Sequence, residues 1–178
     1  MSKFKIQYLF PLLFLGVSFS QCALFNGEYG KNTSRSTSSS SSNHSSSTKE
    51  DRMRKDIVAY AKKHVGARYK YAGRDPRGFD CSGFTYYVLK EFGVTLPTSS
   101  KTQANVGEKI SVKDAQSGDL IFFKRSPASR VFHVSLIVSN DRNGIQVIHS
   151  TSRGVVVDNI TESKYWNPKI SSVRRVLN

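Results

Sequence analysis

The stretch Phe79-Asp80-Cys81-Ser82-Gly83-Phe84 places a cysteine between an acidic residue and a serine. An apolar stripe with helical spacing follows, formed by Phe84, Tyr87, Val88 and Phe92, and Gly93 stands where a helix commonly ends. The pattern predicts a helix whose N-terminus lies at Cys81. Because free backbone N–H groups and the helix dipole favour a thiolate there, we expect the pKa of the Cys81 thiol to be lowered.

Two downstream histidines, His133 and His149, lie in segments that alternate like β-strands. If a hairpin brings the two histidines directly opposite each other, its loop is the three residues 140–142, an allowed length. One imidazole would then take the proton of Cys81, and the other would hold the far nitrogen of the first. This is the arrangement of a thiol hydrolase.

A cysteine and two histidines also fit a zinc site. Zinc requires a fourth ligand at short spacing, and no second cysteine or histidine lies close to Cys81 in the sequence. The thiol hydrolase is therefore the favoured interpretation, and no metal or organic cofactor is expected.

Several further motifs occur in order along the chain, and together they resemble the NlpC-type family of papain-like cell-wall peptidases. Besides the residues around Cys81, they are Gly66 to Gly73, Leu96-Pro97, Gln103, Gly118 to Phe123, His133-Val134 and Ile148-His149-Ser150. The resemblance runs from about residue 53 to residue 178. Two positions depart from the family pattern, since Ala72 and Ser135 stand where glycine is usual, and we expect a shifted backbone dihedral or a narrower cleft there.

The resemblance implies that Cys81 is the nucleophile, His133 the general base and His149 the polar third member. It also implies that Tyr69 lines the oxyanion region and that Asp80 and Ser82 contact substrate. The implied activity is a peptidoglycan endopeptidase that cleaves stem peptides or cross-links next to diaminopimelate. Two alternatives stay open: an N-acetylmuramoyl-L-alanine amidase of related chemistry, and an inactive wall-binding module.

The N-terminal 48 residues differ in composition from the rest of the chain. Residues 1–20 combine a basic start with a short apolar core and predict a secretory signal peptide. Cys22 follows, and the sequence leaves two alternatives open, lipidation of Cys22 or simple cleavage after Ser20. A disulfide between Cys22 and Cys81 is not expected, because it would block the thiol. The serine-rich segment 21–48 predicts a disordered tether, and a capping pair at Thr48 and Asp51 marks the start of the domain at 49–178.

Within the domain, predicted helices come first and predicted strands follow, which indicates an α+β fold with an antiparallel sheet of about five strands. The strands are expected at 119–123, 133–138, 145–149, 155–157 and 173–177, and a short helix is expected from Thr98 or Ser99 to Val106.

The formal net charge of the whole chain is +14. Basic chains often bind nucleic acid, but the predicted export argues against that partner, and a polyanionic cell envelope is the better match. We expect a monomer that acts on peptidoglycan in the periplasm or cell envelope, with membrane attachment through Cys22 as one alternative.

Overall fold

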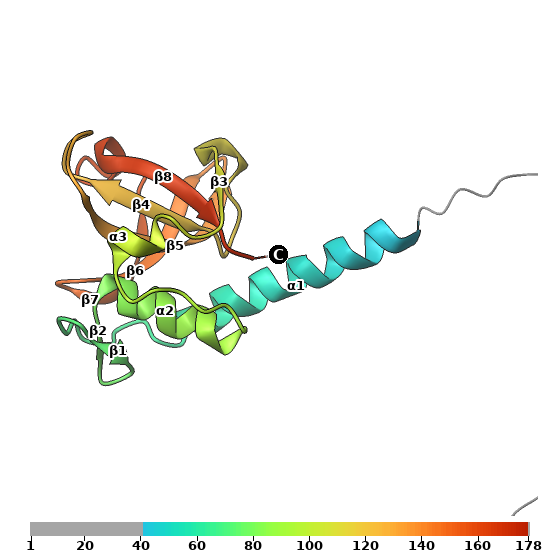
Figure 1. The fold of residues 1–178 in the computed structure, drawn as a ribbon, viewed down its shortest axis with the longest axis horizontal. Helices are drawn as coiled ribbons and strands as arrows, with labels where there is room; N and C mark the ends of the chain where they lie inside the picture. The colour runs from blue at the N-terminus through green and yellow to red at the C-terminus, as the bar shows by residue number, and fades with distance from the viewer. Residues whose placement is uncertain (1–40, 178) are drawn as a thin grey trace, which may run out of the picture. The chain divides into compact units, whose positions relative to one another are not determined.

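The computed structural model describes residues 41–177, with side chains from Lys49 onward (Figure 1). The predicted signal peptide, Cys22 and tether residues 21–40 lie outside the described residues. None of the helices in the described part has the length and apolar character needed to cross a membrane.

The first helix, α1, spans Ser41–Lys62, so the structure differs from the prediction that residues up to 48 are unstructured. Thr48 lies inside this helix and is not its cap. Residues 41–48 are serine, asparagine, histidine and threonine only, so apolar packing does not explain this extension. Once a helix is nucleated, each added residue gains one backbone hydrogen bond, and a serine-rich segment can therefore continue an existing helix.

The helix that begins at the cysteine is confirmed. Helix α2 spans Cys81–Glu91, and helix α3 spans Ser100–Gln103 with Ser99 as its N-cap. A small hairpin of β1 (Arg74–Asp75) and β2 (Gly78–Phe79) precedes α2. Two short 3-10 helices, η1 (Val112–Asp114) and η2 (Asn167–Lys169), complete the helical part.

The main sheet has six strands in the order β3-β8-β4-β5-β6-β7, and all neighbouring pairs are antiparallel. The strands are β3 (Glu108–Ile110), β4 (Leu120–Lys124), β5 (Val131–Asp141), β6 (Gly144–Thr151), β7 (Gly154–Asn159) and β8 (Ile170–Arg175). The five predicted strands are present. The short edge strand β3 carries two exposed charged residues and gave no apolar signal in the sequence.

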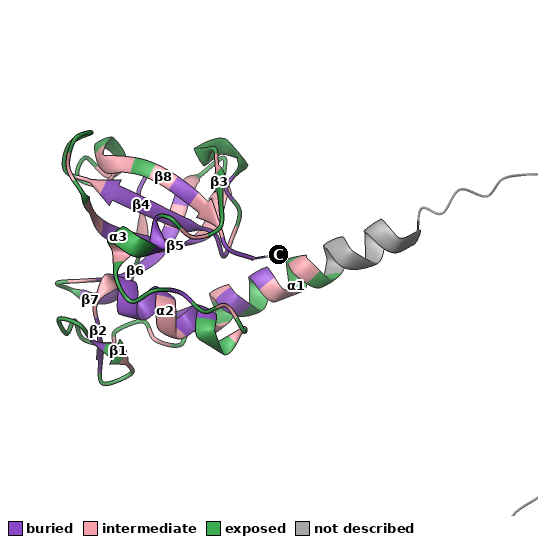
Figure 2. Cartoon of the chain, in the orientation of Figure 1, coloured by how far each residue is buried: buried purple, intermediate pink, exposed green. Residues whose placement is uncertain are grey.

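Alternation along the central strand β4 divides the core into two layers. Leu120 and Phe122 face a cluster that α1, α2 and α3 cover, whereas Ile121 and Phe123 face a second cluster with Ile160. All four of these β4 side chains are completely buried, and Figure 2 shows β4 in the colour of buried residues. Burial on both faces explains why this strand reads as a continuous apolar run.

The β5–β6 hairpin does not have the predicted register. Asp141 pairs with Gly144, so the loop is Arg142-Asn143, and an irregularity follows between Ile137 and Ser139. Beyond it Leu136 pairs with Ile148, which brings Ser135, and not His133, opposite His149. The predicted direct opposition of the two histidines is wrong, because the positive φ of 96° at Gly144 permits a tighter turn and the irregularity shifts the ladder.

A buried ion pair joins α1 to the sheet. Arg54 is 3% exposed and donates to a carboxylate oxygen of Asp119 at 3.0 Å, and Asp119 is completely buried. The same carboxylate accepts bonds from Arg175 and from the backbone N–H of Gln116. The network satisfies Asp119 and ties the helix to the turn before β4.

We predict that Arg54→Met lowers the free energy of unfolding by about 3–5 kcal/mol, because it leaves Asp119 buried without this partner. Urea denaturation measures the effect. The control is Arg77→Ala, which removes an ion pair to Asp75 whose arginine side chain is 82% exposed, and it should change the free energy of unfolding little because solvent screens that pair. Equal losses in the two variants would show that Arg54 does not anchor the helix.

Candidate active site

Cys81 occupies the first turn of α2, and its neighbours hold that turn in place. Asp80 is the N-cap, and its Oδ1 accepts from the Gly83 backbone N–H at 2.6 Å. The Ser82 hydroxyl lies 3.0 Å from the same oxygen and 3.1 Å from the carbonyl oxygen of Thr98. Asp80 and Ser82 thus serve the helix cap and do not line the cavity next to Cys81. Their contact with substrate stays a prediction.

A close backbone contact fixes where this turn sits. A Cβ added to Gly83 would collide with the carbonyl oxygen of Gly73, and that carbonyl accepts from the Asp80 backbone N–H at 3.1 Å. Ala72, which directly precedes Gly73, has a φ of 55° and is the one non-glycine residue with positive φ in the described part of the chain. Ala72 thus adopts the left-handed conformation that favours glycine, and a shift of its dihedral from the family value stays a prediction.

Cys81 and His133 line one cavity of about 600 Å³. Aromatic side chains and residues 150–153 complete its wall, the aromatics being Tyr69, Phe132, Tyr165 and Trp166. Cys81 is a free thiol. Tyr69 is 44% exposed, as expected for a residue at the rim, and its oxyanion role stays a prediction. Within the described residues, no three His, Cys, Asp or Glu side chains are grouped as metal ligands.

The two histidines are joined by a hydrogen bond although they are not directly opposite. His133 Nε2 lies 3.0 Å from His149 Nδ1, a diagonal contact between neighbouring strands. The hydroxyl of Ser135 lies 2.9 Å from the same Nδ1. Ser135, which stands where glycine is usual in the family, thus contacts His149 directly. On the far side, His149 Nε2 lies 3.0 Å from Asp158 Oδ2, and Arg153 pairs with that oxygen.

These contacts set the tautomers of both rings. The carboxylate of Asp158 can only accept, so His149 carries its proton on Nε2 and leaves Nδ1 as an acceptor. His133 then donates from Nε2, which leaves a lone pair on its own Nδ1. That nitrogen is the one available to take a proton in the cavity. Through its hydrogen bond to His149, Asp158 thus determines which nitrogen of His133 is left without a proton.

Trp166 covers the histidine pair. Its ring centroid lies 4.6 Å from that of His133 and 5.1 Å from that of His149, and the Phe132 ring stacks nearly parallel to Trp166 while its centroid also lies 6.2 Å from that of His133. The sequence placed Trp166 only in a bend before the last strand. Asp158 was also missed, because the relevant signal is the β6–β7 register, in which Asp158 pairs with Val147 diagonally to His149.

Burial keeps the resting site neutral. Burial raises the pKa of the Cys81 thiol to about 11, although the backbone N–H of Val134 opposes this shift. Burial lowers the pKa of His133 to about 3, with a further contribution from His149. The predicted lowering of the thiol pKa is wrong, because the loss of hydration outweighs the effect of the helix N-terminus.

Comparison with known proteins agrees with this geometry. The chain is 41% identical over 120 residues to a probable endopeptidase p60 of Listeria seeligeri, covering 67% of this chain and 22% of that protein. It is 36% identical over 114 residues to the murein DD-endopeptidase MepS/murein LD-carboxypeptidase of Escherichia coli, covering 63% of this chain and 57% of that protein. The chain thus spans about a fifth of the first relative and just over half of the second.

Solved structures give the same result. A Staphylococcus aureus protein described as similar to lipoproteins of the NLP/P60 family superimposes with a TM-score of 0.63 at 30% identity, covering 72% of this chain and 42% of that one. A sequence model of the NlpC/P60 family matches residues 66–175, which include Cys81, His133 and His149. The chain belongs to the NlpC/P60 family.

Proposed function

We propose that this protein is an exported cysteine endopeptidase that hydrolyses amide bonds in the stem peptides or cross-links of peptidoglycan. Cys81 is the nucleophile, His133 the general base and His149 the residue that orients it. The observation that carries the proposal is the hydrogen-bonded pair His133–His149, whose first member shares a cavity with a free cysteine thiol. The endopeptidase names of the relatives support the same substrate class.

The reaction begins from a neutral thiol and a neutral imidazole. As Cys81 Sγ attacks the amide carbonyl carbon, the thiol proton passes to Nδ1 of His133. Collapse of the tetrahedral adduct breaks the C–N bond, and His133 returns the proton to the leaving amine. Water then attacks the thioester with His133 as base, releasing a carboxylate product and restoring the thiol. Because the proton moves within the site, no charge has to enter the buried cavity from solvent.

The cavity suits a peptide that carries carboxylates. Arg153 is 61% exposed at the rim and neighbours the polar residues 150–152, so its guanidinium can meet a substrate carboxylate while it remains paired with Asp158. Diaminopimelate carries such a group on its side chain, and cleavage next to it is part of the proposal.

We predict that Cys81→Ser abolishes cleavage, because a hydroxyl is far harder to ionise than a thiol, and that His133→Ala lowers the rate by about 10²–10⁴-fold. Mass spectrometry of digested peptidoglycan would identify the newly exposed amines. Cys22→Ser, which removes the other cysteine, is the control and should cleave normally. A newly exposed amine on the L-alanine that had been joined to muramic acid would mean an amidase. Cleavage by Cys81→Ser would disprove the thiol mechanism.

A second prediction concerns Asp158. Asp158→Asn should lower kcat by roughly tenfold or more, because an amide can donate to His149 and so permit the wrong tautomer, as when the orienting carboxylate of a catalytic triad is replaced. The substitution should change KM little. Asp75→Asn, which alters an exposed carboxylate paired with Arg77, is the matched control. An unchanged kcat in Asp158→Asn would show that the tautomer does not depend on this residue.

Export and attachment complete the proposal. Residues 1–20 act as the signal peptide, and Cys22 becomes the lipidated residue of a protein that faces peptidoglycan, as the likeness to a lipoprotein-like relative supports. Metabolic labelling with a fatty-acid probe should mark the natural chain and not Cys22→Ser. A mature, unlabelled protein that begins at Gln21 would disprove the lipid anchor and leave the proposed peptidase unaffected.

A further inference from the structure

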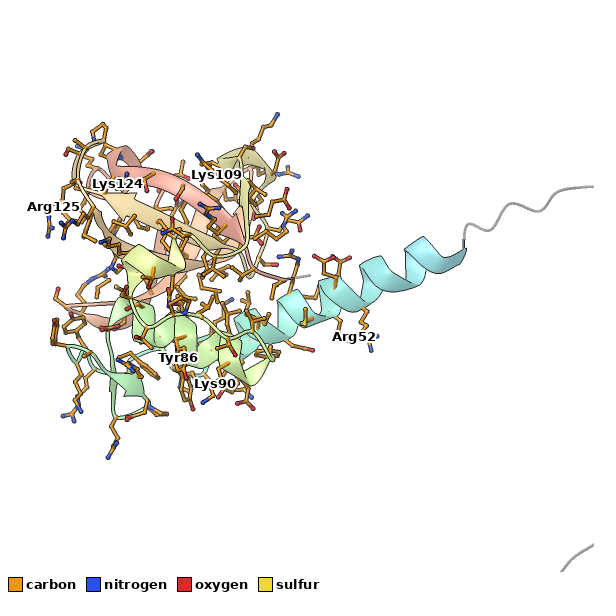
Figure 3. The ribbon with its side chains drawn as sticks, in the orientation of Figure 1. Arg52, Tyr86, Lys90, Lys109, Lys124 and Arg125 are labelled. Atoms are coloured by element: carbon orange, nitrogen blue, oxygen red, sulfur yellow. The ribbon has the colours of Figure 1, made fainter. Side chains whose placement is uncertain are left out.

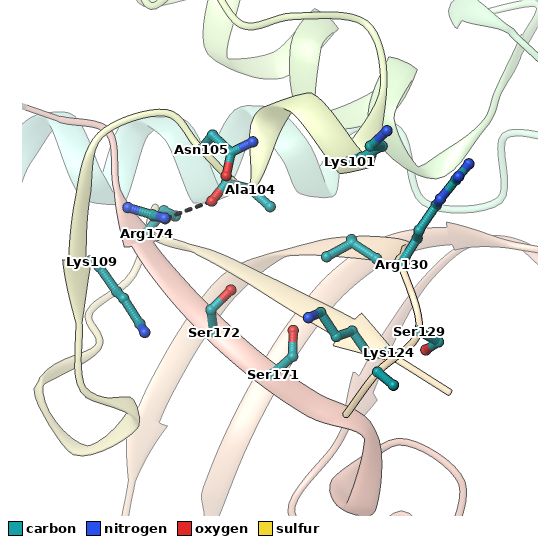
Figure 4. A pocket seen from close by; sticks show the side chains of 12 residues that line it. Lys101, Ala104, Asn105, Lys109, Lys124, Ser129, Arg130, Ser171, Ser172 and Arg174 are labelled. Atoms are coloured by element: carbon teal, nitrogen blue, oxygen red, sulfur yellow. Dashed lines mark hydrogen bonds between the residues drawn. The ribbon is translucent and has the colours of Figure 1, made fainter. Parts of the chain in front are cut away.

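A second cavity, of about 430 Å³, is lined in part by residues of the three adjacent strands β3, β8 and β4. Five cationic side chains line it, namely Lys101, Lys109, Lys124, Arg130 and Arg174, and no acidic residue is among the lining residues. Figure 4 shows Lys109 and Arg174 on one side and Lys124 and Arg130 on the other, with the hydroxyls of Ser171 and Ser172 between them. The Ser171 hydroxyl already donates to the carbonyl oxygen of Phe122, so the five cations and the Ser172 hydroxyl are the groups complementary to an anion here.

The backbone holds two of these charges together. Arg174 donates from Nε to the carbonyl oxygen of Ala104 at 2.7 Å and from Nη1 to that of Gly107 at 3.3 Å, which fixes its guanidinium at the cavity wall. Lys109 is its direct cross-strand partner in the β3–β8 ladder. Like charges directly opposite each other destabilise a sheet. In the described part of the chain neither cation has an acidic partner. An anion bound between them would remove this repulsion.

The positive surface continues toward the active site. An adjoining cavity of about 370 Å³ shares Lys124 and Ser171 with the first and adds Arg125 and Lys169. Arg125 lies 4.5 Å from the ring centroid of Phe132, and Lys169 lies 3.8 Å from that of Tyr165. Phe132 and Tyr165 both line the cavity of Cys81. A long anion on this surface would therefore run up to the rim of the active site.

We propose that this basic surface binds a polyol phosphate polymer, a chain of phosphodiester groups that carries no nucleobases, separately from the peptide cleaved at Cys81. Several cations spread over two adjoining cavities match a chain of charges better than a single ion. Neither cavity is lined by an aromatic residue, so the base stacking that supports binding of single-stranded nucleic acid has no platform. None of the exposed large apolar residues of the described chain lines either cavity, and the one that adjoins them, Tyr165, packs under the Lys169 ammonium, which argues against insertion into a lipid surface.

The test compares two charge-matched double variants of the full chain. Lys109→Gln with Lys124→Gln alters the cavity, whereas Arg52→Gln with Lys90→Gln removes two exposed cations on α1 and α2 that Figure 3 shows well away from it. The probe is a short soluble poly(glycerol phosphate) chain, and binding is measured by calorimetry over a range of salt concentrations. The cavity variant should bind at least about tenfold more weakly, with a salt slope shallower by about 0.7 for each lost contact. The control should change little.

The outcomes separate the alternatives. Equal weakening in both double variants, or no binding by the natural chain, would overturn the proposal in favour of a merely basic surface. Equal or tighter binding of single-stranded DNA or of phosphatidylglycerol vesicles would overturn it in favour of those ligands. Cleavage of a small soluble stem peptide should be the same in all the proteins. Failure of the binding proposal would therefore leave the proposed peptidase function unaffected. If the first cavity variant does not fold, Lys101→Gln with Arg130→Gln addresses the same question.

Discussion

The chain of hydrogen bonds from Asp158 through His149 to His133 is the constraint on which the site depends. It crosses three neighbouring strands, so β5, β6 and β7 must keep their registers for the three side chains to stay hydrogen-bonded. The order of donors and acceptors is one-way, because a carboxylate stands at its far end. The registers of β5, β6 and β7 therefore decide which nitrogen of His133 is left as an acceptor.

Neutrality of the catalytic centre contrasts with the charge around it. Trp166 and Phe132 cover the imidazoles, and burial holds the pKa of His133 low and that of Cys81 high. Outside this apolar cover, cations such as Arg125 and Lys169 lie on the aromatic rim itself. Phe132 thus contacts the imidazole of His133 and also carries Arg125 of the positive surface. The positive surface therefore reaches the aromatic wall of the cavity, where Arg153 is the one cationic residue among the lining residues.

Much of this architecture follows from local pattern in the sequence. Helical spacing after Cys81 located α2, and alternation or a short apolar run located the five longer strands, because these patterns depend on near neighbours along the chain. The failures involve information that near neighbours do not carry. The histidine register depends on an irregularity inside β5, and the part played by Asp158 depends on pairing with β6. The raised pKa of Cys81 follows from burial of the thiol away from water, and a sequence does not show how deeply the first residue of a helix is buried.

The irregularity between Ile137 and Ser139 interrupts the β5–β6 ladder and divides it into two parts with different registers. On the side of the turn, Asn140 pairs with Ile145, and on the side of the histidines Leu136 pairs with Ile148. A ladder interrupted in this way can absorb a change in one half without transmitting it as a register slip to the other. A change of residues at the tip around Arg142 and Asn143 should therefore leave the pairing beside the two histidines in place.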